Sequence, residues 1–270
     1  MSEIIQQIAE FIRLKVPETP TVGIVLGSGM AGLVNAMEVE YILHYTAIPN
    51  FLISTVEGHE GRLVFGKLGG KKVVVMQGRF HFYEGYTMQQ LALPIRVLKL
   101  LGIDTLLLSC ASGGLNSAYR VGDIMIFEDH INLLPGNPLI GPNNSDYGVR
   151  FPDMSAPYSK ELIQKGVLIS EALGIHYHVG VFVAVAGPSL ETRAEYKYLL
   201  TIGADAEAMS TVPEVITARH LGITCFAVAI ITNAGIPDEV KETTHEEVLK
   251  VASEAEGKVT SLFTNLLQEL

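Results

Sequence analysis

The stretch TVGIVLGSGMAGLV at residues 21–34 runs from an apolar segment into a glycine turn. Gly27, Gly29 and Gly32 have the spacing G-x-G-x-x-G, which is typical of a strand that turns into a helix beside a bound phosphate. Such a turn favours an α/β fold whose ligand lies at the carboxyl end of a strand. The same glycines also fit a tight turn that binds nothing, and the segment alone leaves both interpretations open.

Short β-branched runs alternate with amphipathic stretches along the chain, which predicts an α/β fold with a mainly parallel sheet between helices. We expect strands at residues 21–27, 38–45, 62–68, 71–78, 104–111, 123–129, 178–187 and 223–232. We expect helices near 2–15, 88–101, 158–173, 191–202, 211–221 and 244–268. Residues 1–270 then form a single domain, and the turn-rich stretch 131–158 is too long for a mere connection. We interpret it as a functional or subunit-contact loop.

The composition excludes several classes of protein. The 29 acidic and 19 basic residues give a formal net charge of −10, which argues against binding to nucleic acid or to an anionic membrane. No apolar run reaches the ~18 residues of a membrane span, and residues 1–16 do not resemble a signal peptide. Cys110 and Cys225 both lie in apolar runs, which indicates buried free thiols and a cytoplasmic protein.

A dinucleotide site would need a carboxylate at the end of the second strand, about 20 residues after the glycines, to bind ribose hydroxyls. That region reads HYTAIPNF and contains no acid. The dinucleotide interpretation is therefore the weaker one. The turn can still hold a smaller anion, with backbone N–H groups and the Ser28 hydroxyl as donors.

The segment QGRFHFYEGY at residues 77–86 favours an anion site. Arg79, His81 and Tyr83 occupy alternate positions after a strand, so an extended segment would point all three side chains to one side. A guanidinium binds two phosphate oxygens, an imidazole donates another hydrogen bond, and a phenol reaches a sugar hydroxyl. Singly, Arg79 fits a surface ion pair and His81 a partly buried histidine; together they favour a site.

Four further segments offer candidates that also have plain structural interpretations. Backbone donors near Ala111 precede a glycine pair. Glu191 fits either a binding residue or a first-turn helix carboxylate, and Ser210, after Met209, fits an N-cap. Asn233 follows a very apolar strand, and its amide either hydrogen-bonds to a bound base or merely forms a turn.

The motifs LGSGM, QGRFHFYEGY, SGGLN, GPSLET, MSTVPEV and ITN occur in this order over nearly the whole chain. In this the sequence resembles the trimeric purine nucleoside phosphorylase family, of the type specific for 6-oxopurines. The resemblance implies a phosphorylase/hydrolase-like mixed sheet, distorted towards a barrel and flanked by helices. It also implies a homotrimer that converts inosine, guanosine and their 2'-deoxy forms, with phosphate, to free purine and pentose 1-phosphate.

The resemblance also implies roles for individual residues. Phosphate would be bound by Ser28, His59, Arg79, His81, Ala111 and Ser210. Ribose would be bound by Tyr83, Met209, His245 and Tyr147, the last donated by a neighbouring subunit. Glu191 and Asn233 would bind the purine, and Asn233, His81 and Glu191 would carry the catalysis.

No metal or organic cofactor is expected, and inorganic phosphate is a co-substrate. The chain has no H-E-x-x-H, no G-x-S-x-G and no cysteine pair at ligand spacing. His176 and His178 form an H-x-H pair, which we interpret as structural because the sequence shows no third ligand. Catalysis would then depend on positioning and preorganised electrostatics.

Two segments depart from the family pattern. Cys110 and Ser112 alter the usual N-A-A-G-G run, and Glu207-Ala208 replace the V-G that commonly precedes Met-Ser. A carboxylate at position 207 must face solvent or find a partner, which puts the base preference in question. Alternatives are a methylthioadenosine phosphorylase, expected to carry Asp at position 233, a nicotinamide-dependent oxidoreductase and a nucleoside-binding protein without activity.

Overall fold

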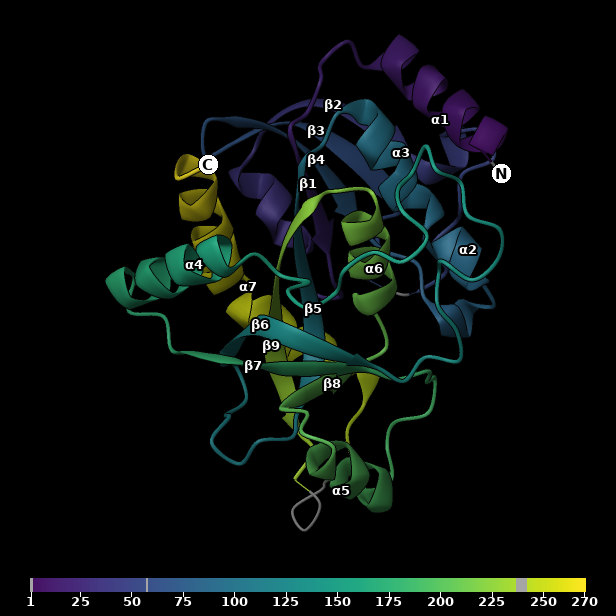
Figure 1. Cartoon of the computed structure of the whole chain (residues 1–270). Helices are drawn as coiled ribbons and strands as arrows, with labels where there is room; N and C mark the ends of the chain where they lie inside the picture. The colour runs from purple at the N-terminus through teal and green to yellow at the C-terminus, as the bar shows by residue number, and fades with distance from the viewer. Residues whose placement is uncertain (1, 57, 237–241) are drawn as a thin grey trace.

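The computed structural model describes residues 2–56, 58–236 and 242–270 (Figure 1). Its strands are β1 (Val22–Leu26), β2 (Glu38–His44), β3 (Arg62–Leu68), β4 (Lys71–Gln77), β5 (Thr105–Gly114), β6 (Ile124–Asn132), β7 (Tyr177–Ala184), β8 (Ala206–Ala208) and β9 (Thr224–Ala234). Its α-helices are α1 (Ser2–Lys15), α2 (Met88–Leu91), α3 (Leu93–Leu101), α4 (Lys160–Ala172), α5 (Arg193–Thr201), α6 (Val212–His220) and α7 (His245–Gln268). Short 3₁₀ helices are η1 (Ala31–Ala36), η2 (Tyr45–Ala47) and η3 (Phe82–Glu84).

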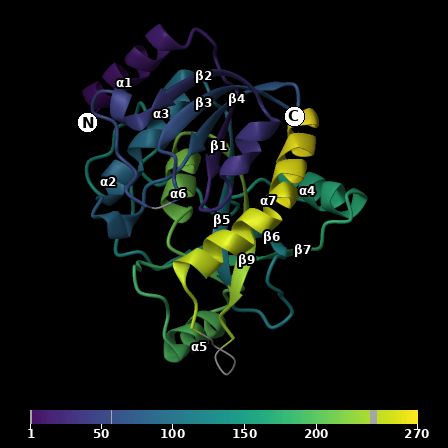
Figure 2. The ribbon, with the colours of Figure 1, turned by 180° about the vertical axis from the view of Figure 1, so that it is seen from behind.

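The strands form one sheet that partly closes on itself. Their order is β2-β3-β4-β1-β5-β8-β7-β6-β9, and an additional pairing of β9 with β5 joins β5, β8, β7, β6 and β9 into a ring. Helices flank this sheet on both sides, and α7 crosses its back (Figure 2). The predicted α/β fold with a mixed sheet distorted towards a barrel is confirmed.

The sheet is more mixed than the strand and helix pattern alone predicts. β1 pairs in parallel with β4 and β5, and β5 pairs in parallel with β9. In contrast, β2–β3, β3–β4, β5–β8 and β6–β9 are antiparallel. The parallel core places the carboxyl ends of β4, β1, β5 and β9 at one edge of the sheet, where α/β proteins bind ligands.

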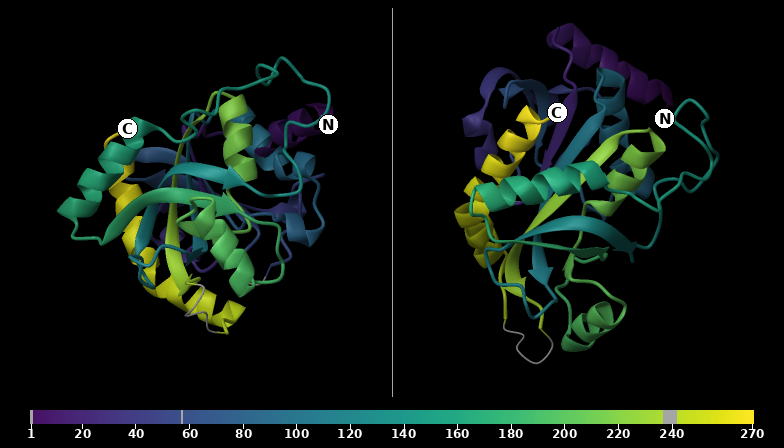
Figure 3. Two further views of the ribbon diagram at one scale, coloured as in Figure 1. Left: turned by 60° about the horizontal axis from the view of Figure 1, so that its bottom comes forward. Right: turned by 60° about the vertical axis from the view of Figure 1, so that its left-hand side comes forward.

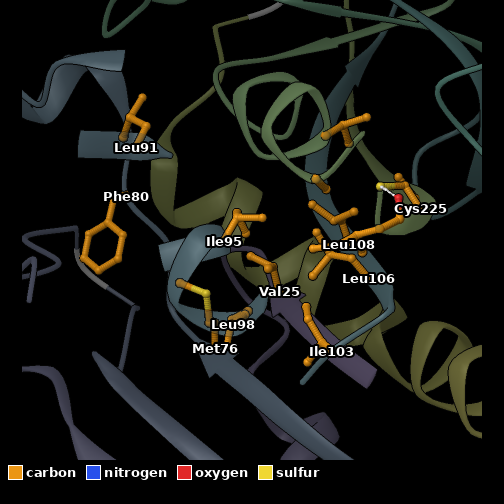
Figure 4. Packing of buried hydrophobic residues seen from close by; sticks show 14 of the residues in the cluster. Val25, Met76, Phe80, Leu91, Ile95, Leu98, Ile103, Leu106, Leu108 and Cys225 are labelled. Atoms are coloured by element: carbon orange, nitrogen blue, oxygen red, sulfur yellow. Dashed lines mark hydrogen bonds between the residues drawn. The ribbon is translucent and has the colours of Figure 1, made fainter. Parts of the chain in front are cut away.

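Alternate side chains of β1 pack into two different cores. Val25 contacts the cluster that contains α1, α3 and α6, whereas Ile24 and Leu26 contact the cluster beneath α7. Figure 4 shows Val25 with Ile95 and Leu98 of α3. A strand buried on both faces is apolar throughout, which explains why the 21–27 segment predicts it so clearly.

The glycines of the opening turn allow close packing. A Cβ at Gly27 would lie 2.7 Å from the Cα of Cys110 on β5, and one at Gly32 would overlap the Glu256 carboxylate of α7. Gly29 has φ +75° and lies against Ala252 of α7. The helix expected after the turn is the 3₁₀ helix η1, so the turn does not begin an α-helix that could hold a pyrophosphate.

Two local expectations need correction. The predicted 88–101 helix is divided into α2 and α3, because Pro94 has no N–H to continue the hydrogen-bond ladder. The short strand β8 was not predicted. Between β6 and α4 the chain forms neither helix nor strand and passes close to the start of α1 (Figure 3).

The described residues contain no helix long and apolar enough to cross a membrane. Cys110 and Cys225 are free and buried, as the sequence predicts.

Candidate active site

A cavity of about 390 Å³ lies where the carboxyl ends of β1, β4, β5 and β9 meet segments before α5, α6 and α7. It is lined by Gly27, Ser28, Val56, Arg79, His81, Tyr83, Cys110, Ala111, Ser112, Gly113, Pro188, Leu190, Glu207, Ala208, Met209, Ser210, Thr232, Asn233, His245 and Val248. Nine of the twelve predicted site residues are therefore brought together, and His59, Glu191 and Tyr147 are not among the lining residues.

Arg79 is the most deeply buried charge of the cavity, with 1% of its surface exposed. Its Nη1 donates hydrogen bonds to the hydroxyls of Ser210 (3.0 Å) and Thr211 (3.2 Å). Its Nε lies 3.3 Å from the Glu214 carboxylate of α6. Among the described residues, Nη2 is buried and has no hydrogen-bond partner. The interpretation of Arg79 as an exposed residue is wrong: it is fixed in the core with a donor left over for an anion.

His59 lies behind Ser28 and orients its hydroxyl. Nδ1 of His59 lies 3.1 Å from the backbone nitrogen of Arg79 and 3.2 Å from its carbonyl oxygen, so the backbone of Arg79 fixes the ring in either tautomer. Nε2 of His59 is hydrogen-bonded to the Ser28 hydroxyl at 3.1 Å, which holds that hydroxyl at the cavity wall. Burial, followed by the nearby His81 and Arg79, lowers the pKa of His59 to about 4, so the ring is neutral at pH 7.

His81 and Tyr83 reach the cavity by a geometry different from the predicted one. The segment is not extended, because Phe82–Glu84 forms η3, and the two rings stack with centroids 4.7 Å apart. The Glu84 carboxylate lies 2.9 Å from Nδ1 of His81 and holds a proton there. Burial lowers the pKa of His81, so the neutral ring presents Nε2 as an acceptor, suited to a protonated phosphate oxygen.

We call Ser28, His59, Arg79, His81 and Ser210 the arginine cluster.

Glu84 lies beside His81 of the arginine cluster. Burial opposes ionisation of Glu84, but hydrogen bonds from His81 and Thr55 outweigh that effect and lower the pKa of Glu84 to about 2. Ser210 is not the N-cap of α6, because that position belongs to Thr211. The Ser210 hydroxyl is instead held by Arg79.

The end of β5 supplies Ala111 and the two departures from the family pattern. Cys110 Sγ and Ser112 Oγ lie 3.3 Å apart and form a hydrogen bond, so the two residues that depart from the family pattern pair with each other within β5. Ala111 lines the cavity between them.

Asn233 and Glu207 face each other across β5. Gly113 of β5 pairs with Glu207 on one side and with Asn233 on the other. The Asn233 Oδ1 accepts from the Thr232 hydroxyl (3.1 Å), which leaves Nδ2 to donate elsewhere. Glu207 is only 5% exposed. A carboxylate facing solvent, one of the two expectations for this position, is therefore excluded.

The partner of Glu207 is Glu191. The two carboxyl groups are hydrogen-bonded to each other, and Glu191 also meets Tyr196. Glu191 is not in the first turn of α5, which begins at Arg193 after the N-cap Thr192. Glu195 forms the capping box there, so the helix-dipole role considered for Glu191 belongs to Glu195. We call Glu191, Glu207 and Asn233 the carboxyl cluster.

Met209 and His245 line the cavity, whereas Tyr147 does not. The Tyr147 hydroxyl lies 3.4 Å from that of Ser2, and the guanidinium of Arg96 lies 5.1 Å from its ring centre. Tyr147 therefore sits on the long loop near α1, outside the cavity of its own chain.

The H-x-H pair has a third group that the sequence did not indicate. Asp123 lies 3.1 Å from Nδ1 of His176 and 2.8 Å from Nε2 of His178. The ligand atoms of these residues all lie within 4.8 Å of one another. His178 also stacks on Tyr119, with centroids 4.0 Å apart, so a structural role is satisfied by the carboxylate and the ring.

The described chain resembles known enzymes over its full length. A family model described as the phosphorylase superfamily matches residues 21–268. Purine nucleoside phosphorylase 1 of Bacillus subtilis is 48% identical, with 100% of this chain and 98% of that protein covered. The chain belongs to the purine nucleoside phosphorylase family. The purine nucleoside phosphorylase of Rattus norvegicus is 44% identical, with 98% and 94% covered.

A solved structure in this purine nucleoside phosphorylase family shares the fold. The Schistosoma mansoni purine nucleoside phosphorylase in complex with inosine has a TM-score of 0.94 at 43% identity, covering 99% of this chain and 96% of that one. The family resemblance seen in the sequence motifs is thus confirmed by overall sequence and by fold.

Sequence reasoning missed the residues that hold Arg79 and several residues that line the cavity. Thr211 and Glu214, which hold Arg79, belong to the quoted MSTVPEV motif but look like ordinary helix-start residues. The apolar lining residues Val56, Pro188, Leu190 and Val248 carry no chemical signal at all.

Proposed function

We propose that this chain is a purine nucleoside phosphorylase that reversibly converts inosine, guanosine and their 2'-deoxy forms, with phosphate, to free purine and ribose or deoxyribose 1-phosphate. The observation that carries the proposal is the buried Arg79, which has an unpaired Nη2 and lines the same cavity as Asn233. A buried cation that lacks a full set of acceptors is suited to an anionic substrate. Phosphate is a co-substrate, and the chemistry needs no metal or organic cofactor.

The arginine cluster would position phosphate below C1' of the sugar. Arg79 contributes charge and Nη2, and Ser28 contributes a hydroxyl held by His59. His81 accepts a hydrogen bond at Nε2 from the P–O–H group of monohydrogen phosphate, which keeps its proton. A phosphate oxygen then forms the bond to C1' as the C1'–N9 bond breaks, and the sugar has oxocarbenium character between the two.

The carboxyl cluster would hold the leaving base. As the glycosidic electrons move into the purine, negative charge grows on O6 and N7, and Nδ2 of Asn233 donates to it. Glu191 would accept the N1–H of a 6-oxopurine. Tyr83, Met209 and His245 would surround the ribose between the two clusters.

The pocket would be completed by a second copy of the chain. Tyr147 lies outside its own cavity, on a loop that contains no helix or strand, which supports its donation to a neighbour within a homotrimer. A cytoplasmic location remains the expectation from the free thiols Cys110 and Cys225.

The test is incubation of the purified protein with inosine, with and without phosphate, while hypoxanthine and sugar products are measured. Release of hypoxanthine that requires phosphate and yields ribose 1-phosphate supports the proposal. Phosphate-independent release would show a hydrolase, and binding without release would show a nucleoside-binding protein.

The rival activities have less support in the structure. Asn at position 233 disfavours a methylthioadenosine phosphorylase. A nicotinamide-dependent oxidoreductase is disfavoured because Gly29 and Gly32 serve the packing of α7 instead of a dinucleotide.

A further inference from the structure

Glu207 and Asn233 meet above a residue that has no side chain. A Cβ at Gly113 would lie 2.3 Å from Oε1 of Glu207 and 3.1 Å from Nδ2 of Asn233. The three residues are register partners on adjacent strands β8, β5 and β9 (Figure 1). The glycine therefore provides the space in which the carboxyl group approaches the amide that would read the base.

On its other side, the Glu207 carboxyl is hydrogen-bonded to Glu191. Two ionised carboxylates offer only acceptors, so this contact requires a proton between them. The charged or titratable groups that act on the pair in the described structure are Glu195 and Tyr196 of α5, and neither is a cation. Burial, reinforced by mutual repulsion, raises the pKa of Glu207 well above its ordinary value.

Glu207 is the member of the pair that a ligand can contact directly. Glu207 lines the cavity together with Gly113 and Asn233. Oε2 of Glu191 is buried and has no hydrogen-bond partner among the described residues. Along the carboxyl cluster the order is thus Glu191, Glu207, Asn233.

We propose that Glu207 is a specificity-determining residue: it shares one proton with Glu191, and this proton can reside on either carboxyl, so that the site accepts 6-aminopurine as well as 6-oxopurine nucleosides. This inference rests on the proposed function, because it uses the base position assigned there. With Glu191 at N1 and Asn233 at N7, Glu207 lies at the 6-substituent.

The two positions of the proton match the two kinds of base. With the proton on Glu207, that group donates to O6 and Glu191 accepts the N1–H of a 6-oxopurine. With the proton on Glu191, that group donates to N1 and Glu207 accepts from the 6-amino group of adenosine. Neither base then leaves a buried group unpaired, whereas a fixed donor and acceptor would reject one of them.

The experiment compares kcat/KM for adenosine and inosine in the parent, Glu207→Gln and Glu207→Val. Gln at position 207 donates to both Glu191 and O6, and Val leaves Glu191 as an ionised acceptor, so both variants suit only 6-oxopurines. We expect the parent ratio of adenosine to inosine to lie within about 100-fold of unity, and both variants to lower it by about ten-fold or more. Glu254→Gln is the control for loss of a carboxylate, because Glu254 is exposed on α7 and does not line the cavity, so the ratio should not change.

Binding of free adenine and hypoxanthine, measured by calorimetry in the presence of phosphate, gives a readout that does not need turnover. The parent should bind both bases, and Glu207→Gln should lose adenine preferentially. A parent that discriminates against adenosine by more than about 100-fold, or a ratio that both substitutions leave unchanged, overturns the inference. Absence of phosphorolysis with both nucleosides overturns the proposed function instead, and base binding still decides the role of Glu207.

Discussion

The arginine cluster and the carboxyl cluster lie in one cavity but are held together by opposite means. In the first, Arg79 is balanced by Glu214 and fixed by the hydroxyls of Ser210 and Thr211. In the second, Glu191 and Glu207 face one another without a nearby cation among the groups that act on them. The first cluster is preorganised to receive a negative charge, and the second keeps a proton in order to avoid one.

The largest effect is expected from removing the cation of the arginine cluster. Arg79→Ala should lower kcat/KM for phosphate by about 10³-fold, because the positive charge and the unpaired Nη2 donor are lost from the anion site. It should also destabilise the fold by about 3–5 kcal/mol, because Glu214 becomes a buried, unpaired charge. Phosphate saturation kinetics and denaturant unfolding measure the two effects.

The double variant Arg79→Ala/Glu214→Gln separates them. It should regain most of the lost free energy of unfolding, because position 214 no longer carries a charge. It should regain none of the lost kcat/KM for phosphate, because the Arg79 cation is still absent. Recovery of phosphate use in this variant would remove Arg79 from the anion site.

The next effect probes the carboxyl cluster. Asn233→Ala should lower kcat/KM for inosine by about 10²-fold through the loss of one donor to the leaving base. The phosphate concentration that gives half-saturation should stay within about two-fold of the parent value, because the arginine cluster is untouched. If the half-saturating phosphate concentration rises as much as kcat/KM for inosine falls, the two clusters do not act separately.

A smaller effect tests whether a neighbouring subunit contributes Tyr147 to the cavity that holds the two clusters. Tyr147→Ala should raise the nucleoside KM by about ten-fold, because an aromatic wall is lost from the neighbour's ribose pocket. Mixed oligomers of Tyr147→Ala and Asn233→Ala chains should recover activity, since some sites combine an intact pocket with an intact Tyr147. If no mixture recovers activity, the pocket is built within one chain.

The smallest effect concerns stability and pH. The pKa of Glu207 is raised in the folded chain, so its contribution to stability is present below its unfolded pKa near 4.5 and lost as pH rises through the folded pKa. Glu207→Gln should therefore unfold like the parent near pH 4.5 and become more stable than it at pH 8, by about 1 kcal/mol or more. A difference that does not change between these pH values would show that Glu207 is ionised throughout.

The two clusters also differ in how well the sequence predicts them. Arg79, His81 and Tyr83 lie in one short segment, so their common location follows from local order. The burial of Arg79 does not, because Glu214 and α6 lie far along the chain.

The carboxyl cluster depends almost entirely on tertiary pairing. β8 has only three residues, too few for a strand periodicity, and its place beside β5 brings Glu207 to Gly113 and Asn233. Glu191 and Glu207 are 16 positions apart with α5 between them, so nothing in the sequence links them. Motif order could identify the family and the parallel strands, but not the partner of a buried carboxyl group.

The proposed function requires that phosphate itself attacks the sugar. The most direct measurement uses inosine with phosphate labelled with ¹⁸O in every position, followed by mass spectrometry of the sugar product. The expected product is ribose 1-phosphate that retains all of the label, because C1' is the atom attacked and no P–O bond breaks. Free ribose without phosphate, or hypoxanthine formed at the same rate when phosphate is omitted, would contradict it.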